Sequence, residues 1–245
     1  MTPSVFLGID VGTSGVTSAL IQLDGTVVAI ATSEYSTRHI RAGWVEQDAE
    51  DWWTAIVATL QELRAKVSFD GLAGIAVSSQ APTLLALDSS LHPVRPALIW
   101  MDRRATEQAE ALESSHSPDG YIAARGNRAD SFYVAAKIAW FRDEEPELLA
   151  RTAHFAQING YIAARLTGVL SIDEAHASLL ALRAAGATEW DQSALTEVGI
   201  TAAQLPPVRR ATDVIGAVTS VAASATGLPP GVPVVAGTVD GAAAA

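Results

Sequence analysis

The sequence of 245 residues contains no cysteine, and this absence excludes one class of chemistry at once. A chain without thiols forms no disulfide, has no thiolate nucleophile and offers no cysteine ligand to a metal ion. The lack of disulfides is typical of proteins in a reducing compartment, so we expect a cytoplasmic protein.

Basic residues are scarce as well. The chain has 16 lysines and arginines against 27 aspartates and glutamates, and its formal net charge is −11. Binding to nucleic acid is driven largely by basic side chains that neutralise phosphates, so we exclude a nucleic-acid partner. The only lysines, Lys66 and Lys137, do not belong to a glycine-rich P-loop. The helicase-like letters Asp173-Glu174-Ala175-His176 are therefore interpreted as a chance match.

The chain also lacks a hydrophobic run that would suggest a membrane span. Its first apolar run, Val5-Phe6-Leu7-Gly8-Ile9, is interrupted at Asp10, and no basic leader precedes it. We therefore expect neither a signal peptide nor a membrane partner. The remaining composition, 49% hydrophobic and 18% charged, predicts one globular domain with a substantial core.

Two short segments near the ends of the chain carry an aspartate beside glycine: Gly8-Ile9-Asp10-Val11-Gly12-Thr13-Ser14-Gly15 and Gly237-Thr238-Val239-Asp240-Gly241-Ala242. In the first, an apolar strand brings Asp10 to its tip, and the next residues can offer N–H groups and hydroxyls to an anion. A carboxylate beside an anion cradle suggests phosphate with a divalent metal. In the second, Asp240 begins an alanine-rich helical start, where the helix N-terminus favours an ionised proton acceptor.

The pattern between these segments alternates strands and helices. Residues 8–36 predict a three-stranded meander with a hairpin turn at Asp24-Gly25. Asp48 is typical of an N-cap, and the apolar spacing behind it predicts a helix to about Val67, with Trp52 in the core. A buried strand over 72–77 follows and ends at Ser78-Ser79-Gln80. Further helical patterns cover 106–113, 132–141 and 159–166.

Four separated motifs now stand in order: the opening hairpin, Gly43-Trp44-Val45-Glu46-Gln47-Asp48, the segment 96–104 (PALIWMDRR) and the closing Gly-Thr-Val-Asp. Together they resemble the FGGY carbohydrate kinases, with xylulokinases nearest. The resemblance implies an α/β, ribonuclease-H-like domain of the actin and hexokinase type. Such a domain has a mixed five-stranded sheet flanked by helices, and a helical insertion. It also implies that residues 1–245 form the N-terminal sugar-binding domain and that a C-terminal nucleotide-binding domain is absent from this chain.

In the reaction that the resemblance implies, a sugar or polyol hydroxyl attacks the terminal phosphoryl group of ATP, with Mg²⁺. Asp10 would organise the metal through water. Gly12, Thr13 and Ser14 would approach the transferring phosphate. Asp240 would accept the proton of the attacking hydroxyl.

The resemblance also places the sugar between the motifs. The residues expected to contact it are Gln80, Ala81, Trp100, Asp102, Phe132 and Tyr133. A flat apolar wall beside polar groups suits a sugar, which has apolar faces and hydroxyl edges. Two alternatives stay open: Trp100 as a core residue, and Asp102 as a partner of Arg103 or a helix cap.

Some positions depart from the family pattern. Thr17 stands where many members carry lysine or arginine, and Ala81 lies in a substrate-reading segment that matches neither xylulokinases nor glycerol kinases. A second hypothesis is therefore a non-catalytic sugar-binding or regulatory module. A third is an ATPase of the wider actin and heat-shock superfamily, which the sugar-kinase motifs disfavour. We expect the isolated chain to have little kinase activity. We also consider a homodimer.

Overall fold

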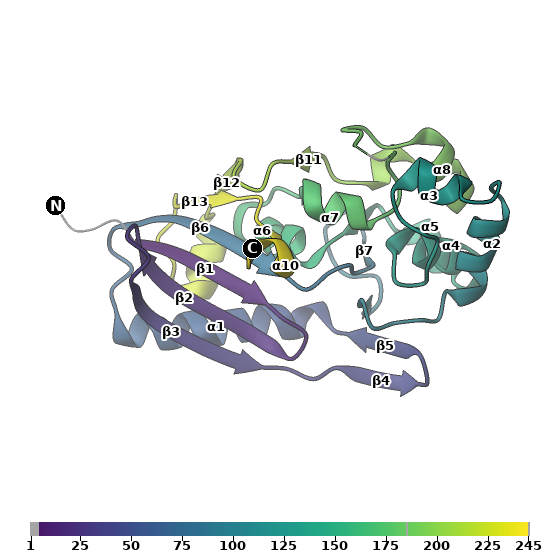
Figure 1. Cartoon of the computed structure of the whole chain (residues 1–245). Helices are drawn as coiled ribbons and strands as arrows, with labels where there is room; N and C mark the ends of the chain where they lie inside the picture. Colours follow the sequence, from purple (N-terminus) through teal and green to yellow (C-terminus); the bar gives the residue numbers. More distant parts are fainter. Residues whose placement is uncertain (1–4, 185, 245) are drawn as a thin grey trace.

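The computed structural model describes residues 5–184 and 186–244 and is built around a mixed sheet (Figure 1). The sheet has seven strands in the order β12-β13-β6-β1-β2-β3, and β14 also pairs with β6. Their bounds are β1 Val5–Val11, β2 Gly15–Gln22, β3 Val27–Glu34, β6 Leu72–Ser79, β12 Val214–Ala217, β13 Pro233–Val235 and β14 Thr238–Val239. The predicted α/β architecture is confirmed. The predicted count of five strands is two short, because the short β12 and β14 also join the sheet.

The predicted meander is confirmed and contains strands β1, β2 and β3. β1 and β2 pair antiparallel with Asp10 opposite Thr17, and β2 pairs with β3. At the turn between β2 and β3, Thr26 N–H donates to Asp24 Oδ1 at 2.9 Å, and Gly25 adopts a positive φ of 87°. Glycine populates this left-handed region without the steric cost of a Cβ, which explains the tight turn.

One face of the sheet is covered by helices α1 (Ala49–Lys66), α6 (Ile158–Thr167) and α9 (Ser220–Thr226). Asp48 caps α1 as predicted, because its side chain accepts from Glu50 N–H at 3.0 Å. Trp52 is fully buried against the sheet, so its predicted core position is confirmed. Its indole N–H nevertheless has a polar partner, Gln47 Oε1 at 3.0 Å. The core therefore connects directly to the polar groups at the strand ends.

A mainly helical lobe with a hydrophobic core of its own lies beyond the sheet (Figure 1). Its helices are α2 Thr106–Ser114, α3 Gly120–Arg125, α4 Val134–Glu144, α5 Pro146–Arg151, α7 Glu174–Leu179 and α8 Gln192–Val198. Small sheets join it to the rest of the chain: β4 Arg38–Arg41, β5 Trp44–Gln47 and β8 Ala97–Leu98; β7 Leu85–Leu87 with β9 His154–Ala156; and β10 Ile172–Asp173 with β11 Val208–Arg209. A 3-10 turn at Ala202–Gln204 and the short helix α10 at Asp240–Ala243 complete the fold. The predicted helical insertion is confirmed.

Helix α4 begins two residues later than the predicted start at Phe132. The N–H of Phe132 donates to Asp130 Oδ1 at 2.6 Å, and the N–H of Tyr133 donates to Asp130 O at 3.0 Å. These bonds form a turn, and Tyr133 has an extended backbone at φ −79° and ψ 152°. An aspartate that bonds the backbone two residues on competes with helical bonding, which explains the later start.

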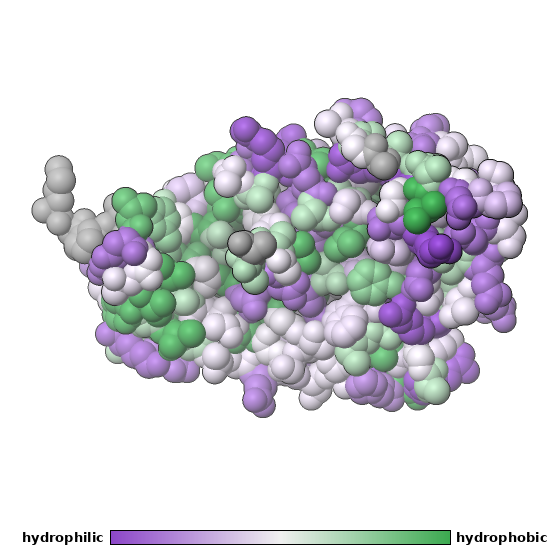
Figure 2. All heavy atoms as spheres, viewed as in Figure 1, coloured by the Kyte–Doolittle hydropathy of each residue, from purple (hydrophilic) through white to green (hydrophobic). Residues whose placement is uncertain are grey.

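Apolar side chains gather on the surface at the left end of the molecule, near the turn between β2 and β3 (Figure 2). Leu23, Val27 and Ile30 are all exposed there. The carboxyl end of β1, which carries Asp10, points toward the opposite end of the sheet (Figure 1). Among the helices of the described residues, none has the length and apolar character needed to cross a membrane.

Candidate active site

The candidate site lies where parallel strands β1, β6 and β14 end together. Asp10 is in register with Ser78 of β6, and Thr238 of β14 is in register with the same Ser78. Carboxyl ends of adjacent parallel strands are a common place for ligand sites in α/β proteins. Ser78 Oγ donates to Asp10 Oδ1 at 2.6 Å. Asp10, Thr17 and Thr238 also line a hollow of about 440 Å³ on this side of the sheet.

The hairpin after Asp10 has its first two carbonyl groups fixed by side chains. Gly12 O accepts from the hydroxyl of Tyr35 and from Gln80 Nε2, the latter at 3.0 Å. Thr13 O accepts from Gln47 Nε2 at 2.7 Å. Burial raises the pKa of the Tyr35 phenol, and the nearby Asp10 carboxylate adds to this shift. The phenol therefore stays protonated and able to donate.

The next two carbonyls of the hairpin are occupied by backbone groups. Ser14 O accepts from Tyr35 N–H at 3.1 Å, and Gly15 O accepts from Gly12 N–H at 2.9 Å. By contrast, the N–H groups of Thr13 and Ser14 have no acceptor among the residues that the structure describes. A turn with anchored carbonyls and free N–H groups has the arrangement of a backbone anion site. The predicted phosphate contacts at Gly12, Thr13 and Ser14 remain a prediction, and this geometry is compatible with them.

Gln80 and Gln47 form a hydrogen-bonded chain whose direction is fixed by Trp52. Because indole N–H can only donate, Gln47 must present Oε1 to Trp52. The same Oε1 accepts from Gln80 Nε2 at 2.8 Å. This arrangement leaves Gln80 Oε1 as a buried acceptor that has no partner within the described part of the chain. Buried acceptors are normally bonded, so a donor from a ligand or water would complete Gln80.

The other predicted sugar-contact residues surround this hairpin or lie near it. Trp100 is half-buried, and its Nε1 donates to Thr13 Oγ1 at 3.1 Å, so the predicted flat wall adjoins the hairpin. Ala81 is half-buried directly after Gln80. Phe132 and Tyr133 are half-buried and pack edge to face, with ring centroids 5.1 Å apart. Contact of these residues with a sugar remains a prediction.

Lys137 of α4 connects Phe132 to the segment that carries Trp100. It is fully buried, and its Nζ donates to Ile99 O at 2.9 Å and to Phe132 O at 3.1 Å. Burial lowers the pKa of Lys137 to about 7. A buried amine that bonds two carbonyls holds the aromatic pair beside the segment of Trp100.

Asp102 occupies a different environment from the one expected for a substrate contact. Its side chain is fully buried, and its carboxylate accepts from Val45 N–H at 2.7 Å and from the Arg104 guanidinium at 2.8 Å. The alternative pairing with Arg103 is wrong, because Arg103 pairs with Asp130 at 2.6 Å. Both oxygens of Asp102 are already bonded to protein donors. A direct sugar contact by this residue stays a prediction and would require these bonds to rearrange.

Asp240 is exposed and begins helix α10, so its predicted place at a helical start is confirmed. Strand β14 pairs with the end of β6 directly before it. Gly237 makes this path possible, because its φ is 74° and a Cβ at this position would overlap the Val77 carbonyl oxygen. Asp240 therefore follows a strand that is fixed to the same edge as Asp10.

We predict that Gly237→Ala costs several kcal/mol of unfolding free energy. Positive φ alone costs about 1 kcal/mol or more for alanine, and the overlap with Val77 adds backbone displacement. Gly231→Ala is the matched control, because Gly231 has a φ of 86° but open space around its Cβ. Urea denaturation of the two variants measures the difference. Equal losses for both would contradict a steric role for Gly237.

The sequence analysis assigned no role in the site to some of its residues. Tyr35 carries no local signal, and Gln47 lay inside a recognised motif without an assigned role. Asp173 and His176, interpreted as a chance helicase match, are buried beside Ser79 at the end of β6. The helicase interpretation stays excluded, but Asp173 and His176 form a buried side-chain cluster with Ser79.

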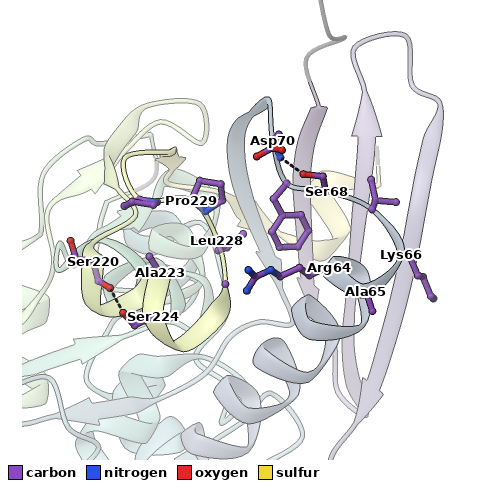
Figure 3. Close-up of a pocket in the computed structure, with 14 residues that line it drawn as sticks. Arg64, Ala65, Lys66, Ser68, Asp70, Ser220, Ala223, Ser224, Leu228 and Pro229 are labelled. Carbon is purple, nitrogen blue, oxygen red and sulfur yellow. Dashed lines mark hydrogen bonds between the residues drawn. The ribbon is translucent and has the colours of Figure 1, made fainter.

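Another hollow, of about 910 Å³, lies at the carboxyl end of α1 (Figure 3). Arg64, Phe69, Leu228 and Pro229 line it. It is larger than the hollow at Asp10, but it contains none of the predicted site residues. The chemistry is better placed at Asp10, where a carboxylate, free N–H groups and a buried free acceptor meet.

Asp10 is the side chain that best suits a metal contact. One of its oxygens accepts from Ser78, and the other has no hydrogen-bond partner among the described residues. Within that part of the chain, no three His, Asp or Glu side chains gather as a metal cluster. Magnesium commonly keeps several waters and binds one or two carboxylates with substrate phosphates, so the donor set fits such a role.

The chain is similar to a known family and to individual proteins. Residues 5–245 match the model of the FGGY family of carbohydrate kinases, N-terminal domain. The chain is 31% identical over 241 residues to the xylulose kinase of Bacillus subtilis (strain 168), covering 98% of this chain and 48% of that relative. It is 31% identical over 212 residues to the glycerol kinase of Nitrobacter hamburgensis, covering 83% and 42%. The chain thus spans about half the length of these curated relatives.

Solved structures of carbohydrate kinases are also similar to this chain. The xylulose kinase from Rhodospirillum rubrum superposes with a TM-score of 0.92 at 28% identity, covering 97% of this chain and 50% of that chain. The ligand-bound xylulose kinase from Lactobacillus acidophilus, at 24% identity, shares the fold with a TM-score of 0.91. These similarities confirm the predicted ribonuclease-H-like fold class.

Proposed function

Because the chain belongs to the FGGY family of carbohydrate kinases, we propose that it is the sugar-binding half of an enzyme that phosphorylates a sugar or polyol. The phosphoryl donor is ATP, and the nearest substrate class is that of the xylulose kinases it resembles. One observation carries the proposal: the hairpin at Gly12 and Thr13 has its carbonyls anchored and N–H groups free beside Asp10.

Phosphoryl transfer depends mainly on positioning and charge neutralisation. In the proposed mechanism, the free N–H groups of Thr13 and Ser14 bind oxygens of the transferring phosphate. Asp10 would hold the metal ion through water. Mg²⁺, when bound with ATP, supplies charge neutralisation at the phosphates. Asp240 accepts the proton of the attacking hydroxyl, for which its exposure and place at a strand end are suitable.

The sugar would lie between the sheet and the helical lobe. Gln80 Oε1 is a buried acceptor that a sugar hydroxyl can complete, and Trp100 provides a flat face beside the hairpin. Ala81, Phe132 and Tyr133 belong to the same proposed surface. For Asp102 we propose an indirect contribution, because its ion pair with Arg104 fixes the segment directly after Trp100.

We further propose that a second, nucleotide-binding domain completes the enzyme, since the relatives are about twice as long as this chain. Closure of two domains over the substrates excludes water and limits wasteful hydrolysis of ATP. On this view the isolated chain has little kinase activity, and the complete enzyme is cytoplasmic.

The proposal predicts sugar-stimulated ADP release by a complete two-domain protein that contains this chain. The assay uses Mg²⁺-ATP with a panel of ketopentoses, ketohexoses, aldonates and polyols, and the isolated chain serves as the comparison. We expect strong turnover on one substrate class and little turnover by the isolated chain. Sugar binding without any stimulated turnover would instead favour a regulatory module.

A further inference from the structure

A buried chain of hydrogen bonds joins Ser79, His176 and Asp173. His176 Nδ1 lies 2.5 Å from Asp173 Oδ2, and His176 Nε2 lies 3.2 Å from Ser79 Oγ. The side chain of His176 is fully buried, and Ser79 and Asp173 are 0% and 1% exposed. The three residues come from the end of β6, the N-cap of α7 and the body of α7. None of them has a role in the mechanism above.

Asp173 is the acceptor at one end of this series of hydrogen bonds. Asp173 accepts from Ala175 N–H at 3.1 Å and from Asn159 Nδ2 at 2.9 Å, so it acts as an ionised acceptor. Burial is the largest single influence and would raise the pKa of Asp173, but the bonds from His176 and Asn159 together outweigh it, and the pKa lies below its usual range. Because the Asp173 carboxylate can only accept, His176 Nδ1 carries a proton and donates to it, while Nε2 pairs with the Ser79 hydroxyl.

The same chain reaches two parts of the proposed active site. Ser79 directly precedes Gln80, the residue with the free buried acceptor. At the other end, Thr238 Oγ1 donates to Asp173 Oδ1 at 3.4 Å, and Thr238 lies in the strand that leads to Asp240. His176 thus lies between the sugar-binding end of β6 and the segment of the proposed base.

Asn159 of α6 strengthens the connection from the opposite side. Its N–H bonds Ser79 Oγ at 3.3 Å, and its Nδ2 bonds Ala236 O at 3.0 Å as well as Asp173. Ala236 lies just before the bend at Gly237. Two independent elements, α6 and α7, therefore hold the same pair of strands together.

The arrangement has the residue types of a hydrolytic triad, but it cannot act as one. Ser79 is fully buried, and its hydroxyl is occupied by His176 and by Asn159 N–H. A nucleophile needs space for a reacting carbonyl at its oxygen. None of the hollows described above reaches Ser79. The cluster holds elements in place and does not carry out chemistry.

We propose that His176 is a positioning residue, which rests on the proposed function: through Ser79 it fixes the position of Gln80, and through Asp173 it fixes the segment of Asp240. The two ring nitrogens serve different ends of the site. Loss of the Ser79 bond should therefore weaken sugar binding, whereas loss of the Asp173 bond should slow the chemical step. Misplacement of a reacting group by about 1 Å can cost about 100-fold in rate.

The test uses two substitutions that each keep one half of the imidazole. His176→Asn retains an amide near the Nδ1 position and can bond Asp173, but it no longer reaches Ser79. His176→Gln places its amide near the Nε2 position and can bond Ser79, but it abandons Asp173. Ser79→Ala is a third, smaller change that removes the hydroxyl alone. Ser171→Ala is the control, because Ser171 is equally buried and its hydroxyl has no partner among the described residues.

In the complete enzyme, we expect His176→Gln to lower kcat about 10- to 100-fold with KM for the sugar little changed. His176→Asn and Ser79→Ala should raise KM about 10-fold with a smaller effect on kcat. Ser171→Ala should change neither. The proposal would be overturned if the two His176 variants had the same kcat and the same KM. A merely structural role predicts such equal effects, because it does not distinguish the two ring nitrogens.

A second readout does not require kinase activity. In this chain, nuclear magnetic resonance should find a proton on Nδ1 of His176, which faces Asp173. Amide hydrogen exchange at Thr238 and Val239 should accelerate at least 10-fold in His176→Gln and stay unchanged in Ser171→Ala. If the complete protein phosphorylates no sugar, the proposed function fails, while the exchange data still decide whether His176 holds β14. Unchanged exchange in His176→Gln would overturn the proposed coupling.

Discussion

Replacement of Asp240 by asparagine is expected to lower kcat of the complete enzyme about 100- to 10,000-fold, the usual contribution of general acid–base catalysis. Asparagine keeps the size of the side chain and its bond from Gly241 N–H, but it cannot take a proton at neutral pH. Because Asp240 is exposed and makes no ion pair with another described residue, its loss should leave folding intact. KM for the sugar should change less than about threefold, since the lost interaction belongs to the transition state.

The measurement is steady-state ADP release on the substrate identified by the panel, with thermal denaturation to verify folding. Asp70→Asn is a suitable control, because Asp70 is an exposed aspartate near the carboxyl end of α1, beside the hollow in Figure 3 and outside the proposed site. Turnover by Asp240→Asn within tenfold of the unaltered enzyme would show that the base is elsewhere. A large rise in KM with unchanged kcat would assign Asp240 to binding instead.

The largest effect on stability is expected for Arg104→Met, at about 3–5 kcal/mol of unfolding free energy. Arg104 is fully buried in its side chain and bonds both Asp102 and Glu46 at 2.8 Å. Its guanidinium also stacks on Trp44, 3.9 Å from the ring centroid, and lies 4.9 Å from that of Trp140. Methionine can fill the space between the rings but leaves the carboxylate of Asp102 buried without its cation.

Urea denaturation of this chain measures the loss without any need for activity. The control is Arg210→Met, which breaks an exposed ion pair between Arg210 and Asp213. Exposed pairs contribute about 0–1 kcal/mol, so the control should be nearly neutral. A double variant with Asp102→Asn separates the two effects, because it removes the stranded charge as well. A loss below about 1 kcal/mol for Arg104→Met would mean that water or a neighbouring group compensates Asp102.

The parts of the fold that sequence predicted are those governed by neighbouring residues. The hairpin at Asp24 and Gly25, the N-cap at Asp48 and the buried face of α1 follow from turn chemistry and helical spacing. The two extra strands could not be predicted in this way. β14 has two residues, and it is a strand only because Gly237 turns the chain onto β6. Short segments carry too little periodicity to identify themselves.

The family motifs place the predicted site residues at Asp10, the hairpin and Asp240, and the structure brings the strands that carry Asp10 and lead to Asp240 to one edge of the sheet. Its supporting contacts join positions that are far apart in the chain. Gln47 bonds Gln80 across 33 residues, and Ser79 bonds His176 across 97 residues. No local pattern encodes such pairs. For Asp102, the motif alone was misleading about the environment of the side chain. Its position in the motif suggested a contact with the substrate, whereas its burial and its bonds to Arg104 favour a role inside the protein.

The single amide of Gln80 has a consequence for the order of events in the proposed enzyme. Its nitrogen donates to the carbonyl of Gly12, while its oxygen has no hydrogen-bond donor among the described residues. A donor bound at the oxygen polarises the amide and strengthens the bond that the nitrogen makes. Sugar and phosphate would then be reciprocal ligands, each raising the affinity of the other by the same factor. In an enzyme with this linkage, the hairpin that binds phosphate is most ordered when sugar is bound. Without sugar the hairpin is less ordered, and ATP is therefore hydrolysed more slowly.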